Sequence, residues 1–209
     1  MNAIELKNIS KKYGDNKIFD HYNLEVKQGT FLGIKGRSGR GKTTLLNIMG
    51  LLEDYEGSLK VMGEEVKPKN KKKRKELLEN VIGYLFQNYA LIDDASVYEN
   101  LKIVSKEKNK KKEKARMLDA LEKVGVAGDY LNKKIYTCSG GEQQRIAVAR
   151  LMLKNCEIVL ADEPTGSLDE KNTEIVMKLL TQLNESGKTI VMVSHDDAAL
   201  SYCKEVIQI

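Results

Sequence analysis

Residues 36–43 read Gly-Arg-Ser-Gly-Arg-Gly-Lys-Thr, a spacing of glycines, lysine and threonine that suits phosphate binding. A glycine-rich turn that enters a helix directs backbone N–H groups at phosphate oxygens, and the helix adds the positive end of its dipole. Lys42 would reach the β- and γ-phosphates of a nucleotide, and the Thr43 hydroxyl would bind Mg²⁺. The other predicted nucleotide-binding residues of this loop are Gly36, Ser38, Gly39, Arg40, Gly41 and Thr44.

The segments on either side of this loop support the same interpretation. Residues 30–35 read as a buried strand, and residues 44–49 read as a helix with an apolar face. An accidental match in an ordinary glycine-rich turn gives no reason for a strand before it and a helix after it. We therefore interpret residues 36–43 as a phosphate-binding loop.

A second pattern places two carboxylates at the end of an apolar run, residues 157–163, which read Glu-Ile-Val-Leu-Ala-Asp-Glu. Such a run is typical of a central parallel strand, and ligands bind at the carboxyl edge of parallel sheets. Asp162 would hold Mg²⁺, and Glu163 would orient and deprotonate the attacking water as general base. Alone, an Asp-Glu pair often just ends a solvated strand; the upstream phosphate loop favours the catalytic interpretation.

The most specific motif is Cys-Ser-Gly-Gly-Glu-Gln-Gln-Arg at residues 138–145. Ser139 and the backbone N–H groups after it are predicted to open a helix over residues 142–153. A helix N-terminus attracts phosphate through its dipole and its unpaired N–H groups. The motif therefore predicts a second phosphate-facing element.

These motifs, in this order, resemble those of the nucleotide-binding subunit of ABC transporters, and the resemblance covers essentially the whole chain. It implies an α/β fold, the P-loop NTPase fold of ABC ATPases, with a RecA-like parallel core, an antiparallel β subdomain and a helical subdomain that carries the signature. The expected boundaries lie within one domain, residues 1–209: about 1–30 and 57–66 for the antiparallel part, about 31–56, 81–87 and 157–209 for the catalytic core, and about 88–156 for the helical part.

The resemblance also assigns roles outside the phosphate loop. Tyr13 matches the aromatic residue that stacks on adenine, Gln87 the glutamine that contacts Mg²⁺ and the attacking water, and His195 the histidine that holds the γ-phosphate. Singly, each has an ordinary reading, as a packing aromatic, a surface amide and a strand-end histidine. Their order along the chain favours the functional one, with Lys42, Gln87, Glu163 and His195 as the catalytic set.

The same resemblance implies a shared site. Ser139, Gly140 and Gly141 match the signature that caps the γ-phosphate of ATP on the opposite subunit, and Asp169 matches the loop that couples the two sites. We therefore expect an ATP-dependent, head-to-tail homodimer with ATP and Mg²⁺ as cofactors. An integral-membrane permease would dock on the helical subdomain and near Gln87.

Two residues depart from the family pattern. Cys138 stands where leucine is common, and a small buried thiol is a modest hydrophobe, so packing should change more than chemistry. Arg40 stands where a small residue is common, which places a cation beside the triphosphate or at the dimer seam. We favour the outward orientation because the backbone and Lys42 already surround the phosphates.

Composition limits the class of protein. The chain has 209 residues, of which 41% are hydrophobic, so it can bury a substantial core as one unit. Three cysteines without metal-ligand spacing indicate a reduced cytoplasmic protein, and no N-terminal signal sequence is visible. The longest apolar runs stop far short of the roughly 20 residues that span a bilayer. We therefore expect a cytoplasmic protein held at the inner face of the cell membrane by a separate permease.

Two lysine-rich runs, residues 67–75 and 106–116, contribute much of the net charge of +5. Such runs are usually solvated loop or helix faces. Attraction to an anionic membrane surface is the main alternative, and no nucleic acid partner is expected.

The resemblance leaves several functions open. The Glu-Asn-Leu segment at 99–101 looks like that of macrolide-efflux and lipoprotein-release ATPases, and residues 87–94 look like those of Gram-positive bacteriocin or peptide exporters. Export of a peptide, bacteriocin or other amphipathic substrate is thus the leading hypothesis. The alternative is a membrane signalling complex that regulates cell division or the cell wall. A soluble ABC ATPase is less favoured, since neither a second cassette nor a long coiled coil is present.

Arg40→Ser tests the orientation of the unusual arginine. If Arg40 points outward, the affinity of the monomer for ATP should stay within about a few-fold of wild type, while ATP-driven dimerisation weakens because a contact across the seam, for example with Asp169, is lost. Calorimetry at a concentration too low for dimers measures the first quantity. A large loss of monomer affinity would instead indicate direct phosphate contact.

Overall fold

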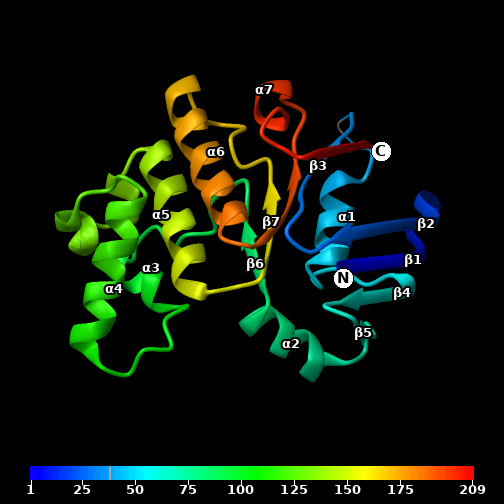
Figure 1. Ribbon diagram of the computed structural model, residues 1–209, viewed down its shortest axis with the longest axis horizontal. Coiled ribbons are helices and arrows are strands. Elements are labelled where there is room, and N and C mark those ends of the chain that lie inside the picture. Colours follow the sequence, from blue (N-terminus) through cyan, green and yellow to red (C-terminus); the bar gives the residue numbers. More distant parts are fainter. Residues whose placement is uncertain (38) are drawn as a thin grey trace.

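A computed structural model describes residues 1–37 and 39–209, and two sheets organise it (Figure 1). The larger sheet has the strand order β6-β7-β8-β3-β9, and its paired strands are parallel. Its strands are β3 (Phe31–Lys35), β6 (Ile82–Leu85), β7 (Ile158–Asp162), β8 (Thr189–Val193) and β9 (Glu205–Gln208). Every residue of β7 and β8 is buried, which is the pattern of a parallel sheet covered on both faces.

The register of the parallel sheet aligns the strand ends that matter for chemistry. Asp162 of β7 and Ile34 of β3 both pair with Val193 of β8. The segments that leave these three strands therefore emerge side by side at the carboxyl edge. They are the phosphate loop, the pair of carboxylates and the histidine segment.

The smaller sheet is antiparallel, with the order β2-β1-β4-β5. Its strands are β1 (Asn2–Tyr13), β2 (Asn16–Lys27), β4 (Glu56–Val61) and β5 (Glu64–Val66). Ile4 and Leu6 are buried, whereas Glu5 between them is partly exposed. This alternation is typical of a sheet with one face on the core.

Helices cover both faces of the parallel sheet (Figure 1). On one face α1 (Lys42–Met49) lies between the two sheets, and its buried side chains share a core with Leu160 and Val191. On the other face α5 (Gly140–Lys154), α6 (Glu170–Glu185) and α7 (Asp197–Leu200) share a core with Val159 and Met192. Neighbouring residues of one strand thus pack into the hydrophobic cores on opposite faces of the sheet, because strand side chains alternate between faces.

The remaining helices form the left part of Figure 1, apart from α2. They are α3 (Val97–Lys102), α4 (Lys110–Lys123) and two short 3₁₀ helices, Gly128–Asn132 and Ile135–Thr137. Met117, Leu121 and Val124 are buried against this group, at the spacing of one face of a helix. Cys138 is also buried, in agreement with its interpretation as a small hydrophobe.

The predicted α/β class, with a parallel sheet, an antiparallel sheet and a helical part, is confirmed. Among the elements that were not predicted, two stand in segments noted above. The first lysine-rich run leads into α2 (Lys71–Asn80), whose only buried residue is Leu77, and Glu205–Gln208 forms the edge strand β9. The helix expected over residues 142–153 begins earlier, at Gly140, because Ser139 caps it. Along the described ranges 1–37 and 39–209, no helix combines the length and apolarity that a bilayer span requires.

Asn100 organises the segment between β6 and α3. Its side chain is fully buried; its Oδ1 accepts from the backbone N–H of Ile92 at 2.7 Å, and its Nδ2 donates to the carbonyls of Ile92 (3.1 Å) and Ser96 (3.0 Å). Ser96 and Glu99 add a capping box at the start of α3. The Glu-Asn segment noted in the sequence therefore has a structural role in folding this loop.

Asn100→Ala should lower the free energy of unfolding by about 1–3 kcal/mol, because the Ile92 N–H loses its acceptor and the carbonyls of Ile92 and Ser96 each lose one donor. Chemical denaturation measures this change. Asn80→Ala is the control, since Asn80 is exposed, its Nδ2 donates to the Glu76 carbonyl of its own helix, and its Oδ1 accepts only from the exposed Lys106 ammonium. Equal losses for the two variants would contradict the role given to Asn100.

Candidate nucleotide-binding and hydrolysis site

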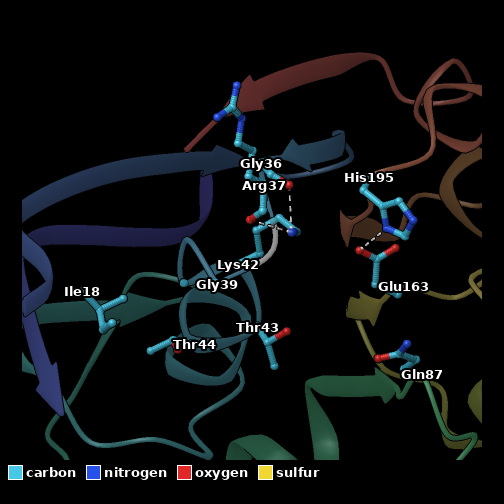
Figure 2. Close-up of a pocket in the computed structure, with 11 residues that line it drawn as sticks. Ile18, Gly36, Arg37, Gly39, Lys42, Thr43, Thr44, Gln87, Glu163 and His195 are labelled. Carbon is cyan, nitrogen blue, oxygen red and sulfur yellow. Dashed lines mark hydrogen bonds and ion pairs between the residues drawn. The ribbon is translucent and has the colours of Figure 1, made fainter. Parts of the chain in front are cut away.

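A cavity of about 530 Å³ opens at the carboxyl edge of the parallel sheet (Figure 2). The phosphate loop and the start of α1 form one wall, and side chains from the ends of β6, β7 and β8 form the other. The lining residues are Ile18, Gly36, Arg37, Gly39, Gly41, Lys42, Thr43, Thr44, Gln87, Glu163 and His195. Nine of the predicted site residues therefore meet at one cavity.

Lys42 is held by its own loop. Its Nζ donates to the carbonyl oxygens of Gly36 at 2.8 Å and Arg37 at 3.2 Å, and the residue is buried. These contacts place a cation at the mouth of α1, whose N-terminal dipole end attracts anions as well. In Figure 2 the Arg37 guanidinium points away from this group, so Arg37 contributes its backbone.

Gly41 shows why the loop needs glycine next to the lysine. It caps α1 with φ +89°, and a Cβ atom there would lie 2.5 Å from Ile18 Cγ2 and 3.0 Å from the Phe19 ring. Both the backbone conformation and the close approach of β2 thus exclude a side chain. The contact fixes the start of α1 against the antiparallel sheet.

Thr43 and Asp162 form the candidate metal site. Thr43 Oγ1 donates to Asp162 Oδ1 at 3.2 Å, and burial raises the pKa of the Asp162 carboxyl despite that hydrogen bond. A cation beside this carboxylate would favour its ionised form. Along the described parts of the chain no group of three or more His, Cys, Asp or Glu side chains gathers for a metal. The donor set fits Mg²⁺, which usually binds one or two carboxylates together with substrate phosphates.

Glu163 and His195 form a pair across the cavity mouth. His195 Nδ1 lies 2.9 Å from Glu163 Oε1, and Figure 2 shows Gln87 on the same side of the cavity. The Glu163 side chain is 13% exposed and that of His195 is 70% exposed. Glu163 also has a left-handed backbone, with φ +44°, while its N–H donates to the carbonyl of Val193. This uncommon conformation turns the carboxylate off the strand and toward the phosphate loop.

The signature residues form a separate helix start. Ser139 Oγ accepts from the Glu142 N–H, and the Glu142 carboxylate accepts from the Ser139 N–H at 2.7 Å. Glu142 also accepts from the Tyr130 hydroxyl, and these hydrogen bonds, that of Tyr130 first, lower the pKa of Glu142. Gly140 and Gly141 are the first two residues of α5. None of these signature residues lines the cavity.

Four other predicted site residues also lie off the cavity lining or cannot be placed. Tyr13 ends β1 with 48% exposure, and the Lys11 ammonium lies 4.9 Å from the centroid of its ring. Arg40 is exposed, in keeping with an outward orientation. Asp169 caps α6 by accepting from the Asn172 N–H, which lowers its pKa. Ser38 lies outside the described residues.

Two lining residues were not predicted. Arg37 lies inside the glycine-rich motif, but the sequence does not show that its backbone carbonyl accepts a hydrogen bond from Lys42. Ile18 lies on β2, and nothing in the local pattern indicates that this strand packs over the phosphate loop. Only the tertiary arrangement of the antiparallel sheet brings Ile18 to the cavity.

Comparison with known proteins agrees with this geometry. The family described as "ABC transporter" matches residues 19–166. The macrolide export ATP-binding/permease protein MacB of Campylobacter jejuni is 39% identical over 209 residues, covering 99% of this chain and 32% of that protein. The methionine import ATP-binding protein MetN of the same species is 38% identical and covers 92% of this chain and 63% of its own length. The chain thus spans about a third of the length of the MacB relatives.

Solved structures agree as well. A dimeric structure of MJ0796, titled a bacterial ABC transporter cassette, has a TM-score of 0.91 and 34% identity, and covers 99% of this chain and 94% of that chain. A second dimer of the same cassette, in a post-hydrolysis state bound to ADP and Pi, has a TM-score of 0.90. With a glycine-rich loop entering α1, a Glu163–His195 pair beside it and a Ser139-capped helix in this fold, the chain belongs to the ABC transporter family and is an ATP-hydrolysing cassette.

Proposed function

We propose that this cassette hydrolyses ATP as a head-to-tail homodimer and drives a membrane permease. The observation that carries the dimer is the separation of the two halves of the site: the cavity holds Lys42, Glu163 and His195, but no signature residue. A second copy in C2 symmetry would supply Ser139 and Gly141 to each cavity. The dimeric MJ0796 structures support this arrangement.

Each residue of the cavity has a proposed task. Lys42 and the loop N–H groups bind the β- and γ-phosphates, and Thr44 and the other loop residues complete the cradle. Thr43, Asp162 and Gln87 would hold Mg²⁺, which when bound neutralises charge on the β- and γ-phosphates.

Hydrolysis needs a base and an oriented water. Glu163 accepts the proton of the attacking water, while Gln87 and His195 orient the water and the γ-phosphate. The 2.9 Å contact between His195 and Glu163 keeps the carboxylate aimed into the cavity. Tyr13, at the exposed end of β1, would stack on adenine, and Arg40 and Asp169 would meet at the dimer seam.

The proposed subdomains follow the expected boundaries: about 1–30 and 57–66 for the antiparallel part, about 31–56, 81–87 and 157–209 for the core, and about 88–156 for the helical part. The permease would dock on the helical part and on the segment after Gln87. Two exposed isoleucines, Ile92 (55%) and Ile103 (60%), offer apolar contacts there. This contact would hold the cassette at the inner face of the cell membrane.

The proposed cargo is a peptide, bacteriocin or other amphipathic molecule that is exported. MacB relatives named for macrolide export support the direction, and a relative named for methionine import makes direction a point to test. Purification from native membranes, with identification of the bound integral protein, tests the proposal. Recovery of a hydrolase regulator without a transport path would instead favour a signalling complex.

Lys42→Ala should abolish nucleotide binding, because the phosphates lose the one buried cation of the described cavity. Calorimetric titration with ATP measures this loss, and circular dichroism checks that the fold remains. Lys35→Ala is the matched control, since Lys35 lies at the end of β3 and its ammonium contacts Asp197 at 2.5 Å. ATP affinity of Lys42→Ala equal to that of the control would contradict the assigned role.

Glu163→Gln should preserve ATP binding and slow turnover by about 10²–10⁴-fold, the usual contribution of a general base. The ATP-bound dimer should then accumulate on size-exclusion chromatography. Glu157→Gln, at the other end of the same strand, should hydrolyse ATP at the wild-type rate. Wild-type turnover in Glu163→Gln would remove Glu163 from the mechanism.

A further inference from the structure

The turn that follows Gln87 has an unusual backbone. Tyr89 and Ala90 both lie in the left-handed region, with φ +62° and +47°. Two successive non-glycine residues in this region are uncommon and need support from their surroundings. From the sequence, residues 87–94 resemble those of peptide exporters, but no role was predicted for this turn.

Arg150 supplies that support from the signature helix. Its Nη1 donates to the Ala90 carbonyl at 2.7 Å and its Nη2 donates to the Tyr89 carbonyl at 2.9 Å. Burial lowers the pKa of Arg150, as expected for a guanidinium taken largely out of water. The turn is therefore fastened to α5, whose first turn carries the signature.

The Tyr89 hydroxyl lies where three functional segments meet. It is 2.9 Å from Ser167 Oγ, in the loop that leads to Asp169. A Cβ atom on Gly140 would lie 3.1 Å from the same oxygen. The Tyr89 hydroxyl thus contacts Ser167 in the loop before α6 and lies beside Gly140 of the signature. Tyr89 itself is part of the turn that follows Gln87. The contact also accounts for a glycine at 140, where a side chain would crowd the tyrosine.

Further contacts tie the same elements together. Gln144 of α5 is fully buried and donates through Nε2 to the Pro164 carbonyl at 2.5 Å, directly after Glu163. Arg145 of α5 contacts Asn172, which is bonded to Asp169. The signature helix is therefore hydrogen-bonded to the segment between Glu163 and Asn172, and Tyr89 connects that segment to Gln87.

We propose that Tyr89 is a positioning residue: its hydroxyl sets Gly140 and Ser167 relative to Gln87, so that the signature and the Asp169 loop are aligned for the second subunit. The proposal rests on the proposed roles of the signature and of Gln87 in the ATP dimer. Tyr89 touches neither the cavity nor the nucleotide-binding residues of its own subunit. Its loss should impair pairing of subunits and turnover, not the first binding of ATP.

Tyr89→Phe removes only the hydroxyl. We expect kcat to fall by about three- to ten-fold, the value of one hydrogen bond, with the monomer affinity for ATP unchanged. In a Glu163→Gln background, the same substitution should raise the protein concentration needed for ATP-driven dimerisation. Ser167→Ala should give the same losses, and the double variant should be no worse than either single variant. Ser167→Thr, which keeps a hydroxyl, should restore most of the activity.

Tyr98→Phe is the matched control, because Tyr98 also uses a hydroxyl bond, to Glu113 at 2.9 Å, but lies in the helical part away from the cavity. It should leave kcat unchanged. Wild-type kcat in Tyr89→Phe, losses that multiply in the double variant, or an equal loss in Tyr98→Phe would each overturn the proposal. Full turnover in the single variant Glu163→Gln would instead overturn the proposed hydrolysis site. This result comes from a different variant, so the two outcomes can be distinguished.

Discussion

The phosphate site depends on backbone N–H groups that one tight turn presents at the start of a helix. That turn must leave β3, reverse, and enter α1 within a few residues, which requires left-handed glycines at 39 and 41. Its position is set from both sides. β3 lies between β8 and β9, and β2 packs Ile18 and Phe19 against Gly41. The antiparallel sheet thus serves as a brace for the phosphate loop as well as a cover for α1.

The parallel sheet converts chain order into proximity. Lys42, Glu163 and His195 are far apart in sequence, yet their strands are neighbours in register, so their side chains share one edge. The signature starts a helix on the other face of the same sheet, in the core that α5 shares with α6. The two halves of the proposed site thus lie apart on one sheet, and in the proposed dimer a second copy would complete each site.

Sequence patterns predicted the parts of this protein that are locally encoded. The helix that follows the glycine-rich loop, the strand end at Asp162 and the helix opened by Ser139 each need only a few adjacent residues. All three lie where they were predicted, although the last begins at Gly140 and not at Glu142. Helix α2 was not predicted because it is rich in lysine and buries a single residue, Leu77, so no apolar face is visible in its sequence. The contact of Ile18 with Gly41 and those of Arg150 with the Tyr89 turn were not predicted, because they join residues 23, 60 and 61 positions apart. No local pattern reports such pairs, since tertiary packing alone decides them.

The hydrogen bonds of Lys42 to the carbonyls of Gly36 and Arg37 bear on how fast the site responds to nucleotide. If a loop had to become ordered around its ligand, each binding event would lose conformational entropy, and binding would be slower. Here the Lys42 ammonium is already held by two backbone carbonyls. When a phosphate binds, it replaces a neutral carbonyl as the hydrogen-bond acceptor of this ammonium. Binding of a phosphate then includes a change of hydrogen-bond partner at the buried Lys42 ammonium. In the proposed dimer, the association and separation of the subunits would then be the slower steps, and these are the steps that would drive the permease.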